Sequence, residues 1–324
     1  MATPFLLSID PKEAASGDLT LQQISYFGRV LINASTAPEA SDFLRQNFRL
    51  LDVYVDARGI EPVGDVVDIL NAGAAVAFVS LAQLKALSQE ENLPSSRLVV
   101  SVSSEGEIQE LKSWISEDAE RKDVGVHTSS LEAEVIIKGL GLDPSLQPVY
   151  RSFDKNSATT EALEKNREQG AISVVPSAAV TVEKNAAGKI SAAQLLTSGA
   201  VAEKGSGLYA TSVTDERGIS LGLVWSSDES VSEALRTGTG VYQSRKRGLW
   251  YKGQSSGDTQ ELIRVGFDCD SDCFVFVVRQ KGRGLSSLGS FWFSSSANVF
   301  KASVTWAPQA ASVHTQDYLG CRIR

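Results

Sequence analysis

The first 200 residues alternate short, almost continuously apolar runs with stretches of helical periodicity. The apolar runs predict strands at residues 5–9, 30–32, 51–55, 74–79, 98–102, 124–127 and 172–175. The stretches between them predict helices that include residues 37–47, 65–71, 81–89 and 105–115, with Asn71-Ala72-Gly73 as a helix stop. Strands that are apolar along their whole length are typical of a parallel sheet covered on both faces. We therefore expect an α/β domain that is barrel-like or an incomplete (β/α) barrel, because about 200 residues is the lower limit for a full barrel.

The pattern changes after a polar turn at residues 183–189 and a glycine-rich break at residues 204–207. Strand-like runs at residues 208–213 and 219–224 are joined by a turn, and a third run lies at residues 262–267. Ser226 and Glu229 have the spacing of a capping box at the start of a helix. We predict a scaffold domain at residues 1–203, a small α+β domain at 204–284, and a divergent, poorly ordered tail at 285–324.

Composition narrows the class of protein. Hydrophobic residues make up 42% of the chain and charged residues 22%, and 31 basic against 39 acidic side chains give a net charge of −8. This balance argues against a nucleic-acid or anionic-membrane binder. No signal peptide is visible, the longest apolar run falls far short of the roughly 20 residues of a membrane span, and three cysteines do not form a disulfide framework. We expect a soluble, cytoplasmic protein.

The segment Asp268-Cys269-Asp270-Ser271-Asp272-Cys273 is the densest group of metal-binding side chains. On an extended chain its three carboxylates would project to one side and Cys269 to the other. Carboxylates suit Mg²⁺ or Ca²⁺, and a thiolate suits Zn²⁺. The alternative is an acidic turn with two buried cysteines.

A second group of functional side chains runs from Tyr242 to Asp258 and contains four cations, several hydroxyls and aromatic residues. Guanidinium groups and backbone N–H groups suit a phosphate, and Trp250 or Tyr251 could stack on a base. One alternative is a solvated charged loop. Another is a nucleic-acid site that uses Arg245, Lys246 and Arg247, which the net acidity disfavours.

Together the two segments closely resemble phosphoribosyl-AMP cyclohydrolase, an enzyme of histidine biosynthesis. The resemblance rests on Gly238-Thr239-Gly240-Val241-Tyr242-Gln243-Ser244-Arg245-Lys246-Arg247-Gly248-Leu249-Trp250-Tyr251-Lys252-Gly253 and on Asp268-Cys269-Asp270-Ser271-Asp272, and it covers about residues 207–284. The sequence of these segments is most similar to that of the fungal multifunctional proteins that also carry phosphoribosyl-ATP pyrophosphohydrolase and histidinol dehydrogenase. The region before it resembles their N-terminal extension, and residues 52–57 and 66–74 are similar to barrel enzymes of the same pathway.

The resemblance implies a hydrolase of a cyclic amidine that opens the purine ring of phosphoribosyl-AMP between N1 and C6 with a zinc-activated water. Cys269 is the implied zinc ligand, and Asp268, Asp270 and Asp272 are the implied magnesium ligands. The family is dimeric, which implies a homodimer through this domain with each zinc site completed across the interface. The implied substrate-binding residues are Ser244, Arg245, Arg247, Trp250, Lys252, Ser255 and Ser256.

The sequence departs from the family after Gly284, where the family continues Phe-Cys-His and has another cysteine seven residues after the first. This chain has Leu285-Ser286-Ser287 and Phe293 instead, so Ser287 replaces the family histidine and the catalytic residue is unknown. One thiolate cannot form a zinc site. Codons such as CTG-TCA-TCT read Phe-Cys-His in the neighbouring frame when TT precedes them, which suggests a frame-shifted or mis-spliced tail.

The other cysteine and histidine residues are weaker candidates for metal ligands. His314 and Cys321 are also seven apart, but they lie about thirty residues too late for the family spacing. Cys273 is expected to be a packed cysteine, and His127 a structural residue of the first domain. A competing hypothesis is therefore a catalytically dead binding or scaffold protein that keeps the substrate loop and has lost the metal.

Overall fold

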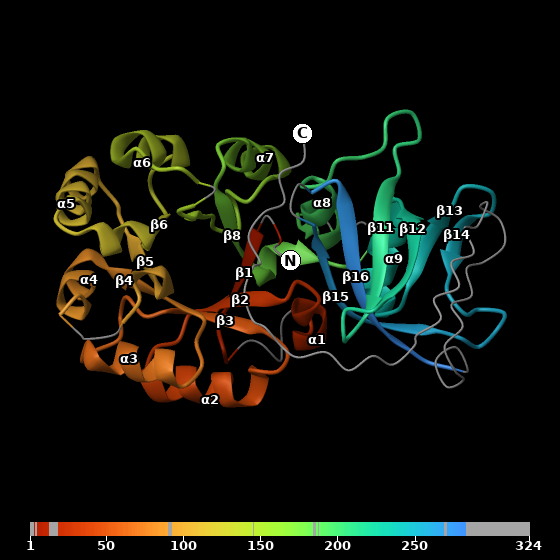
Figure 1. The fold of residues 1–324 in the computed structure, drawn as a ribbon, viewed down its shortest axis with the longest axis horizontal. Helices are drawn as coiled ribbons and strands as arrows, with labels where there is room; N and C mark the ends of the chain where they lie inside the picture. The colour runs from red at the N-terminus through yellow and green to blue at the C-terminus, as the bar shows by residue number, and fades with distance from the viewer. Residues whose placement is uncertain are drawn as a thin grey trace, which may run out of the picture. The chain divides into compact units, whose positions relative to one another are not determined.

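The first domain is a closed barrel of eight parallel strands (Figure 1). The computed structural model describes residues 3, 5–12, 19–89, 93–144, 146–183, 186, 188–268 and 271–282. The barrel closes because β8 pairs with β1, with Phe5 opposite Ser173. The predicted α/β barrel is confirmed, and its sheet is complete. The strands are β1 (Phe5–Ile9), β2 (Arg29–Ile32), β3 (Asp52–Asp56), β4 (Val76–Ser80), β5 (Leu98–Ser101), β6 (Gly125–Thr128), β7 (Val149–Ser152) and β8 (Ile172–Pro176).

Helices surround the barrel, and polar caps start most of the longer ones. Thr36, Ser80, Ser104 and Thr159 each accept a hydrogen bond from a backbone N–H in the first turn of the helix that follows. The helices are α1 (Leu21–Ser25), α2 (Ala37–Asn47), α3 (Gly64–Asn71), α4 (Leu81–Leu87), α5 (Glu105–Ser116), α6 (Ala133–Leu140) and α7 (Thr160–Glu168). The helix stop predicted after Asn71 is confirmed, since Gly73 adopts a φ of 114° directly after α3.

Strand β7 is the barrel strand that the apolar pattern missed. Its sequence Val-Tyr-Arg-Ser is half polar, and only Val149 and Tyr150 are buried. The guanidinium of Arg151 donates to both carboxylate oxygens of Glu132 at 2.8 Å, which supplies partners for a charged side chain within the sheet.

The second domain is built on a six-stranded sheet with the order β14-β13-β12-β11-β16-β15. Strand β11 pairs with β16 in parallel, and the other neighbours are antiparallel. Between the two domains lie the short parallel strands β9 (Val180–Thr181) and β10 (Ile190–Ser191) and helix α8 (Ala192–Thr197), which packs against α9. The remaining elements are β11 (Tyr209–Asp215), β12 (Ser220–Ser226), α9 (Asp228–Thr237), β13 (Val241–Ser244), β14 (Gly248–Tyr251), β15 (Gln260–Phe267) and β16 (Cys273–Gln280).

The capping box of α9 lies one residue later than its spacing predicts. Ser227 is the N-cap, and its side chain and backbone exchange hydrogen bonds with Ser230. Ser226 is instead fully buried at the end of β12, where its hydroxyl accepts a hydrogen bond from Thr211 at 2.7 Å. The prediction with Ser226 and Glu229 was wrong because the strand needs that serine in the core.

The barrel contacts the second domain through the edge strand β15. The backbone N–H of Val265 donates to the carbonyl of Tyr26 at 2.7 Å, and Arg264 donates to the carbonyl of Leu50 at 3.3 Å. Gly28 makes room for this arginine, because a Cβ at residue 28 would lie 2.8 Å from its Nε. Backbone groups of the sheet edge are therefore partly satisfied by the barrel.

His127 lies inside the barrel and is buried, with 1% of its surface exposed. Its Nδ1 is 2.8 Å from the hydroxyl of Ser101, and its Nε2 is 2.8 Å from the hydroxyl of Ser152. Burial, together with a smaller effect of the positive charge of Arg58, lowers the pKa of His127 to about 4. The imidazole is therefore neutral near pH 7.

This burial predicts a pH-dependent stability. The unfolded chain takes up a proton on residue 127 below about pH 6.5, whereas the folded chain does so only near pH 4. As the pH falls from about 6.5 to 4, we expect the free energy of unfolding to decrease by up to roughly 3 kcal/mol. Above pH 6.5 we expect no pH dependence from His127. Denaturant titrations should show a smaller pH dependence in H127Q and an unchanged one in H314Q. Equal pH dependence in all three proteins would contradict the assignment.

Candidate functional site

The strand register of the second domain relates the positions of the two candidate segments. Cys273 lies opposite Ala210, Ala210 opposite Trp225, and Trp225 opposite Gln243. Cys273 and Gln243 therefore lie at the same end of the sheet, and from there β13 runs in the same direction as β16, away from the loop before Cys273. We call this end of the sheet the acidic-loop end. Neighbouring strands are about 4.8 Å apart, so β16 and β13 lie roughly 14 Å from each other there.

The acidic loop is a hairpin turn between β15 and β16. The N–H of Asp268 donates to the carbonyl of Cys273 at 3.1 Å, and the N–H of Cys273 donates to the carboxylate of Asp268 at 3.3 Å. Ser271 has a φ of 63°, which reverses the chain. The extended conformation assumed for alternating carboxylates was therefore wrong. Cys269 and Asp270 lie outside the described residues.

The part of the loop that the structure describes does not by itself form a metal site. No group of three or more His, Cys, Asp or Glu side chains among the described residues could hold a metal ion. The Asp268 carboxylate already accepts from Cys273, and the Cys273 thiol, half-buried, donates to the carbonyl of Phe274 at 3.3 Å. The donor types suit magnesium, but one thiolate from Cys269 does not complete a zinc site.

The basic turn, residues 245–247, joins β13 to β14. The hydroxyl of Ser244 accepts a hydrogen bond from the N–H of Arg247 at 3.2 Å. The guanidinium of Arg245 lies 4.0 Å from the ring centroid of Trp225 and donates to both carboxylate oxygens of Glu203 at 2.9 Å. Hydrogen bonding to Ser206 and the charge of Arg245 lower the pKa of Glu203. Arg245 thus has an orienting partner in the segment between the domains.

The remaining predicted substrate-binding residues lie on β14 and in the loop that follows it. Lys252 follows β14, where its N–H donates to the carbonyl of Gly240. Its ammonium group is 5.8 Å from the ring of Trp250, which is half-buried beside Tyr242. A pocket of about 280 Å³ beside this loop is lined by Thr239, Tyr251, Lys252, Gln254 and Thr259.

The loop after Lys252 folds back tightly on itself. Ser255 and Ser256 are exposed, and the hydroxyl of Ser256 accepts from the N–H of Asp258 at 3.3 Å. Gly253 is required for this turn, because a Cβ there would lie 2.4 Å from the backbone of Asp258. Of the seven predicted substrate-binding residues, Ser244, Arg245 and Arg247 therefore lie at the end of β13 and in the basic turn, Trp250 lies on β14, and Lys252, Ser255 and Ser256 lie in the loop after β14.

The sequence pattern missed several polar residues beside these segments. Glu203 holds Arg245, although the two are 42 residues apart. Glu233 is 4% exposed beside β14, and it accepts from Tyr251 at 3.0 Å and from Arg236 at 2.7 Å. Glu233 lies on the partly apolar face of α9, and that position was the available signal for a buried carboxylate.

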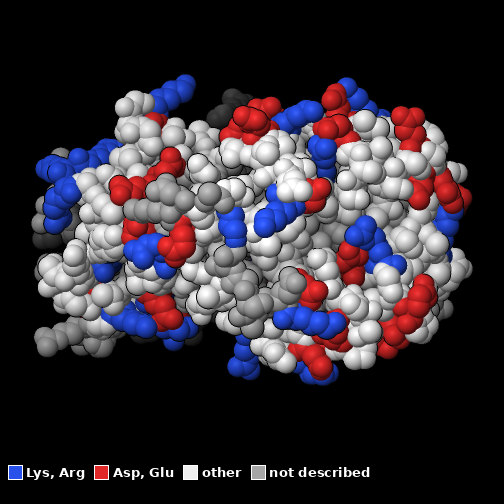
Figure 2. All heavy atoms as spheres, turned by 180° about the vertical axis from the view of Figure 1, so that it is seen from behind, with Lys and Arg blue, Asp and Glu red and all other residues white. Residues whose placement is uncertain are grey.

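Ser287, Phe293, His314 and Cys321 lie outside the described residues, as does the whole predicted tail. His127 belongs to the barrel, as expected. No helix in the described part of the chain is long and apolar enough to cross a membrane. On the face seen in Figure 2, Lys and Arg side chains alternate with Asp and Glu and form no continuous basic surface.

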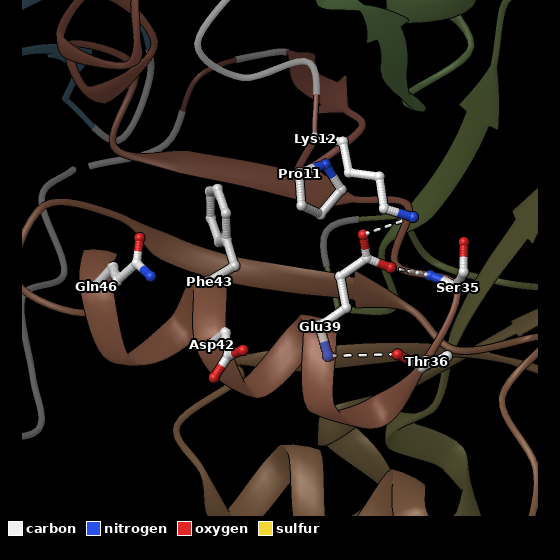
Figure 3. A pocket seen from close by; sticks show the side chains of 8 residues that line it. All are labelled: Pro11, Lys12, Ser35, Thr36, Glu39, Asp42, Phe43 and Gln46. Atoms are coloured by element: carbon white, nitrogen blue, oxygen red, sulfur yellow. Dashed lines mark hydrogen bonds and ion pairs between the residues drawn. The ribbon is translucent and has the colours of Figure 1, made fainter.

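A further pocket of about 450 Å³ lies in the barrel domain, beside α2 (Figure 3). Its lining includes Lys12, which is 3.2 Å from Glu39, and Glu39 also accepts from the N–H of Ser35 at 2.8 Å. The backbone hydrogen bond from Ser35 lowers the pKa of Glu39. The pocket therefore has its cation already neutralised by its own carboxylate.

Comparisons with known proteins agree with this layout. Residues 222–286 match the family described as phosphoribosyl-AMP cyclohydrolase. The chain is 36% identical over 289 residues to the histidine biosynthesis trifunctional protein of Neurospora crassa, covering 86% of this chain and 32% of that protein. It is 36% identical over 254 residues to the histidine biosynthesis bifunctional protein of Schizosaccharomyces pombe, covering 76% of this chain and 59% of that protein.

A bacterial relative matches the second domain alone. The phosphoribosyl-AMP cyclohydrolase of Roseobacter denitrificans is 46% identical over 61 residues, or 18% of this chain and 48% of that protein. The chain spans about a third of the length of the Neurospora protein and less than two thirds of the Schizosaccharomyces protein. The chain thus carries a domain of the phosphoribosyl-AMP cyclohydrolase family behind a barrel, and most of its length is homologous to multifunctional fungal proteins of histidine biosynthesis.

Proposed function

We propose that the second domain serves the hydrolytic opening of the purine ring of phosphoribosyl-AMP. The observation that carries this proposal is the match of residues 222–286 to the cyclohydrolase family, a range that includes both the basic turn and the acidic loop. In this proposal Arg245 and Arg247 bind phosphate oxygens. Lys252 and the hydroxyls of the pocket beside it bind a second polar group of a substrate.

Zinc is the proposed source of the activated water, and magnesium the proposed ion of the carboxylates. Asp268, Cys269, Asp270 and Asp272 are the candidate ligands in this chain. Since the chain offers one thiolate in the loop and lacks the family's Phe-Cys-His after Gly284, the residues of one copy do not complete the zinc site. The missing ligands must come from the tail, from a second chain, or from a reading frame that this sequence does not carry.

The geometry of β16 supports a homodimer through this domain. The strand runs from Cys273 at the acidic-loop end to Gln280 at the opposite end, seven steps that span roughly 23 Å. The position where the family has its remaining zinc ligands therefore follows the end of the sheet that is far from Cys269. In an antiparallel pair of copies, this far end of one subunit meets the acidic loop of the other.

We expect no turnover of phosphoribosyl-AMP by the 324-residue chain supplied with zinc and magnesium, and less than one zinc bound per chain. The variant L285F/S286C/S287H/F293C, which restores the family residues, should bind about one zinc and open the purine ring. Absorbance change and metal analysis measure the two effects. Turnover by the unaltered chain would contradict the missing-ligand argument, and H314A and C321A would then show whether the tail supplies ligands.

A catalytically dead binding protein is the second candidate, and the absence of the two family cysteines favours it. It predicts that the restored variant also stays inactive, while the chain still binds phosphoribosyl-AMP without turnover. Calorimetric titration of the zinc-free protein measures that binding. Absence of binding would contradict both candidates.

The outer face of the sheet supplies a test of the homodimer. Leu221, Leu223 and Trp225 share this face by strand alternation, and Leu223 is 72% exposed. We expect light scattering to give a dimer for the full chain and a monomer for L223D, because a buried unpaired carboxylate is costly. L146D is the matched control, since Leu146 is 76% exposed on the barrel domain. A dimer unaffected by L223D would contradict this interface.

Glu203 and a substrate phosphate compete for Arg245 in this proposal. Exposed ion pairs contribute about 0.2–1 kcal/mol, so E203Q should tighten the binding of phosphoribosyl-AMP by zinc-free protein about 1.5- to 5-fold. The control is E216Q in the same domain, which removes a carboxylate that lies 3.1 Å from Nε of Arg279. Weaker binding in E203Q would show instead that Glu203 positions Arg245 for the ligand.

A further inference from the structure

The inner surface of the barrel changes character between its middle and its carboxyl-terminal mouth. The middle layer is almost entirely apolar and aromatic, and it is formed by Leu6, Leu31, Tyr54, Phe78, Val99, Tyr150 and Val174. Two residues further along each strand, strand alternation brings the next side chain to the same inner face. In seven of the eight strands or directly after them, that residue is polar: Ser8, Asn33, Asp56, Ser80, Ser101, His127 and Ser152.

Solvent reaches this polar layer. Ser101 and Ser152 are only partly buried, whereas Phe78 and Val99 beneath them are fully buried. His127 forms the floor between the two layers, with its ring 5.2 Å from that of Phe78. The inward-facing hydroxyls thus lie at the end of the barrel where enzymes of this architecture bind their ligands.

Arg58 adds a cation to the same mouth. Its Nε donates to Oδ1 of Asp56 at 2.8 Å and its Nη2 to Oδ2 at 2.5 Å. Nη1 of Arg58 makes no hydrogen bond with any residue that the structure describes, and the side chain is 39% exposed. Asp56, Ser101 and Ser152 are the last residues of the parallel strands β3, β5 and β7, so the ion pair lies at the same mouth of the barrel as the two hydroxyls. We call Asp56, Arg58, Ser101, His127 and Ser152 the mouth cluster.

The mouth cluster lowers the stability of the barrel relative to apolar side chains at the same positions. A buried imidazole is desolvated, and an inward-facing ion pair gives up part of its hydration. The middle layer shows that this barrel packs well with Leu, Val and Phe at equivalent positions one layer below. Polar side chains that are kept at such a cost, and that have hydrogen-bond donors left for a ligand, are typical of a binding site.

We propose that the mouth cluster binds a small hydroxylated oxyanion. Arg58, oriented by Asp56, takes the carboxylate or phosphate through Nη1. The hydroxyls of Ser101 and Ser152 bind the ligand hydroxyls, with their orientation fixed by the two nitrogens of His127. This site is separate from the cyclohydrolase domain and does not depend on its activity.

His127 is the reporter for the test, because the chain contains two histidines and H314Q leaves only this one. Full-length H314Q protein is titrated with glycerol 3-phosphate, glycerate and glycerol, and the imidazole signals are followed by NMR at constant pH. We expect saturable shifts with at least one anion at millimolar concentration and none with glycerol. The anion that binds more tightly shows whether the site prefers a phosphate or a carboxylate.

R58M in the same background should weaken the binding at least tenfold, because it removes the oriented cation. R49M is the control, since Arg49 is an exposed arginine that lies over Phe48. Failure of both anions to shift His127 would overturn the proposal, as would equal affinity in R58M and the parent protein. Shifts with glycerol alone would overturn the oxyanion class. Circular dichroism of R58M checks that the barrel is folded, and S152A, which keeps Arg58, should weaken binding without changing the preferred anion.

Discussion

The parallel pairing of β11 with β16 decides where the chemistry of the second domain lies. Parallel neighbours need a crossover, and here it comprises β12, α9, β13, β14 and β15. The register of Ala210 opposite Cys273 places the acidic loop before the start of β16 and, through β12, brings Gln243 of β13 to the same end of the sheet. The same register sends the chain after Gln280 away from that loop. A slip of one residue would turn the Phe274 and Phe276 side chains out of the core, so burial fixes the register.

The sequence predicted the strands of the barrel well because each is buried on both faces. Runs such as Phe5–Ile9 and Leu98–Ser101 are apolar except for one serine each, which is the pattern of a strand covered on both faces. Strand β7 escaped because half of its residues are polar, and the partner of Arg151 is Glu132, nineteen residues away in the sequence. The shifted cap of α9 has a similar cause. Local spacing allowed Ser226 or Ser227, and the hydrogen bond of Ser226 to Thr211 decided between them.

The candidate site was predictable as a set of residues and not as a geometry. Asp268 and Arg245 stand in motifs that a reader of the sequence can find, but their relative positions follow from the order and direction of the strands. The turn at Ser271 carries no glycine, so nothing local indicated a positive φ there. Glu203 lies in a segment that reads as a linker, and its role depends on Arg245 reaching across 42 residues of sequence. Such pairs are visible only in three dimensions.

The scaffold prediction for residues 1–203 rests on the absence of a phosphate-binding glycine-rich loop from that part of the sequence, and this absence is weak evidence. The glycine-rich loops that bind phosphate use backbone N–H groups, and their absence removes one way to hold an anion. A barrel can also present ligand-binding side chains directly from its strands, because every second residue points to the axis. Ser101, His127 and Ser152 come from three consecutive strands, and their two contacts at 2.8 Å form a continuous chain across the mouth. Because each strand contributes one position to this layer, polarity there is spread over residues far apart in the sequence. Such a pattern has no regular spacing in the sequence. Within each strand the single polar residue is outweighed by its apolar neighbours.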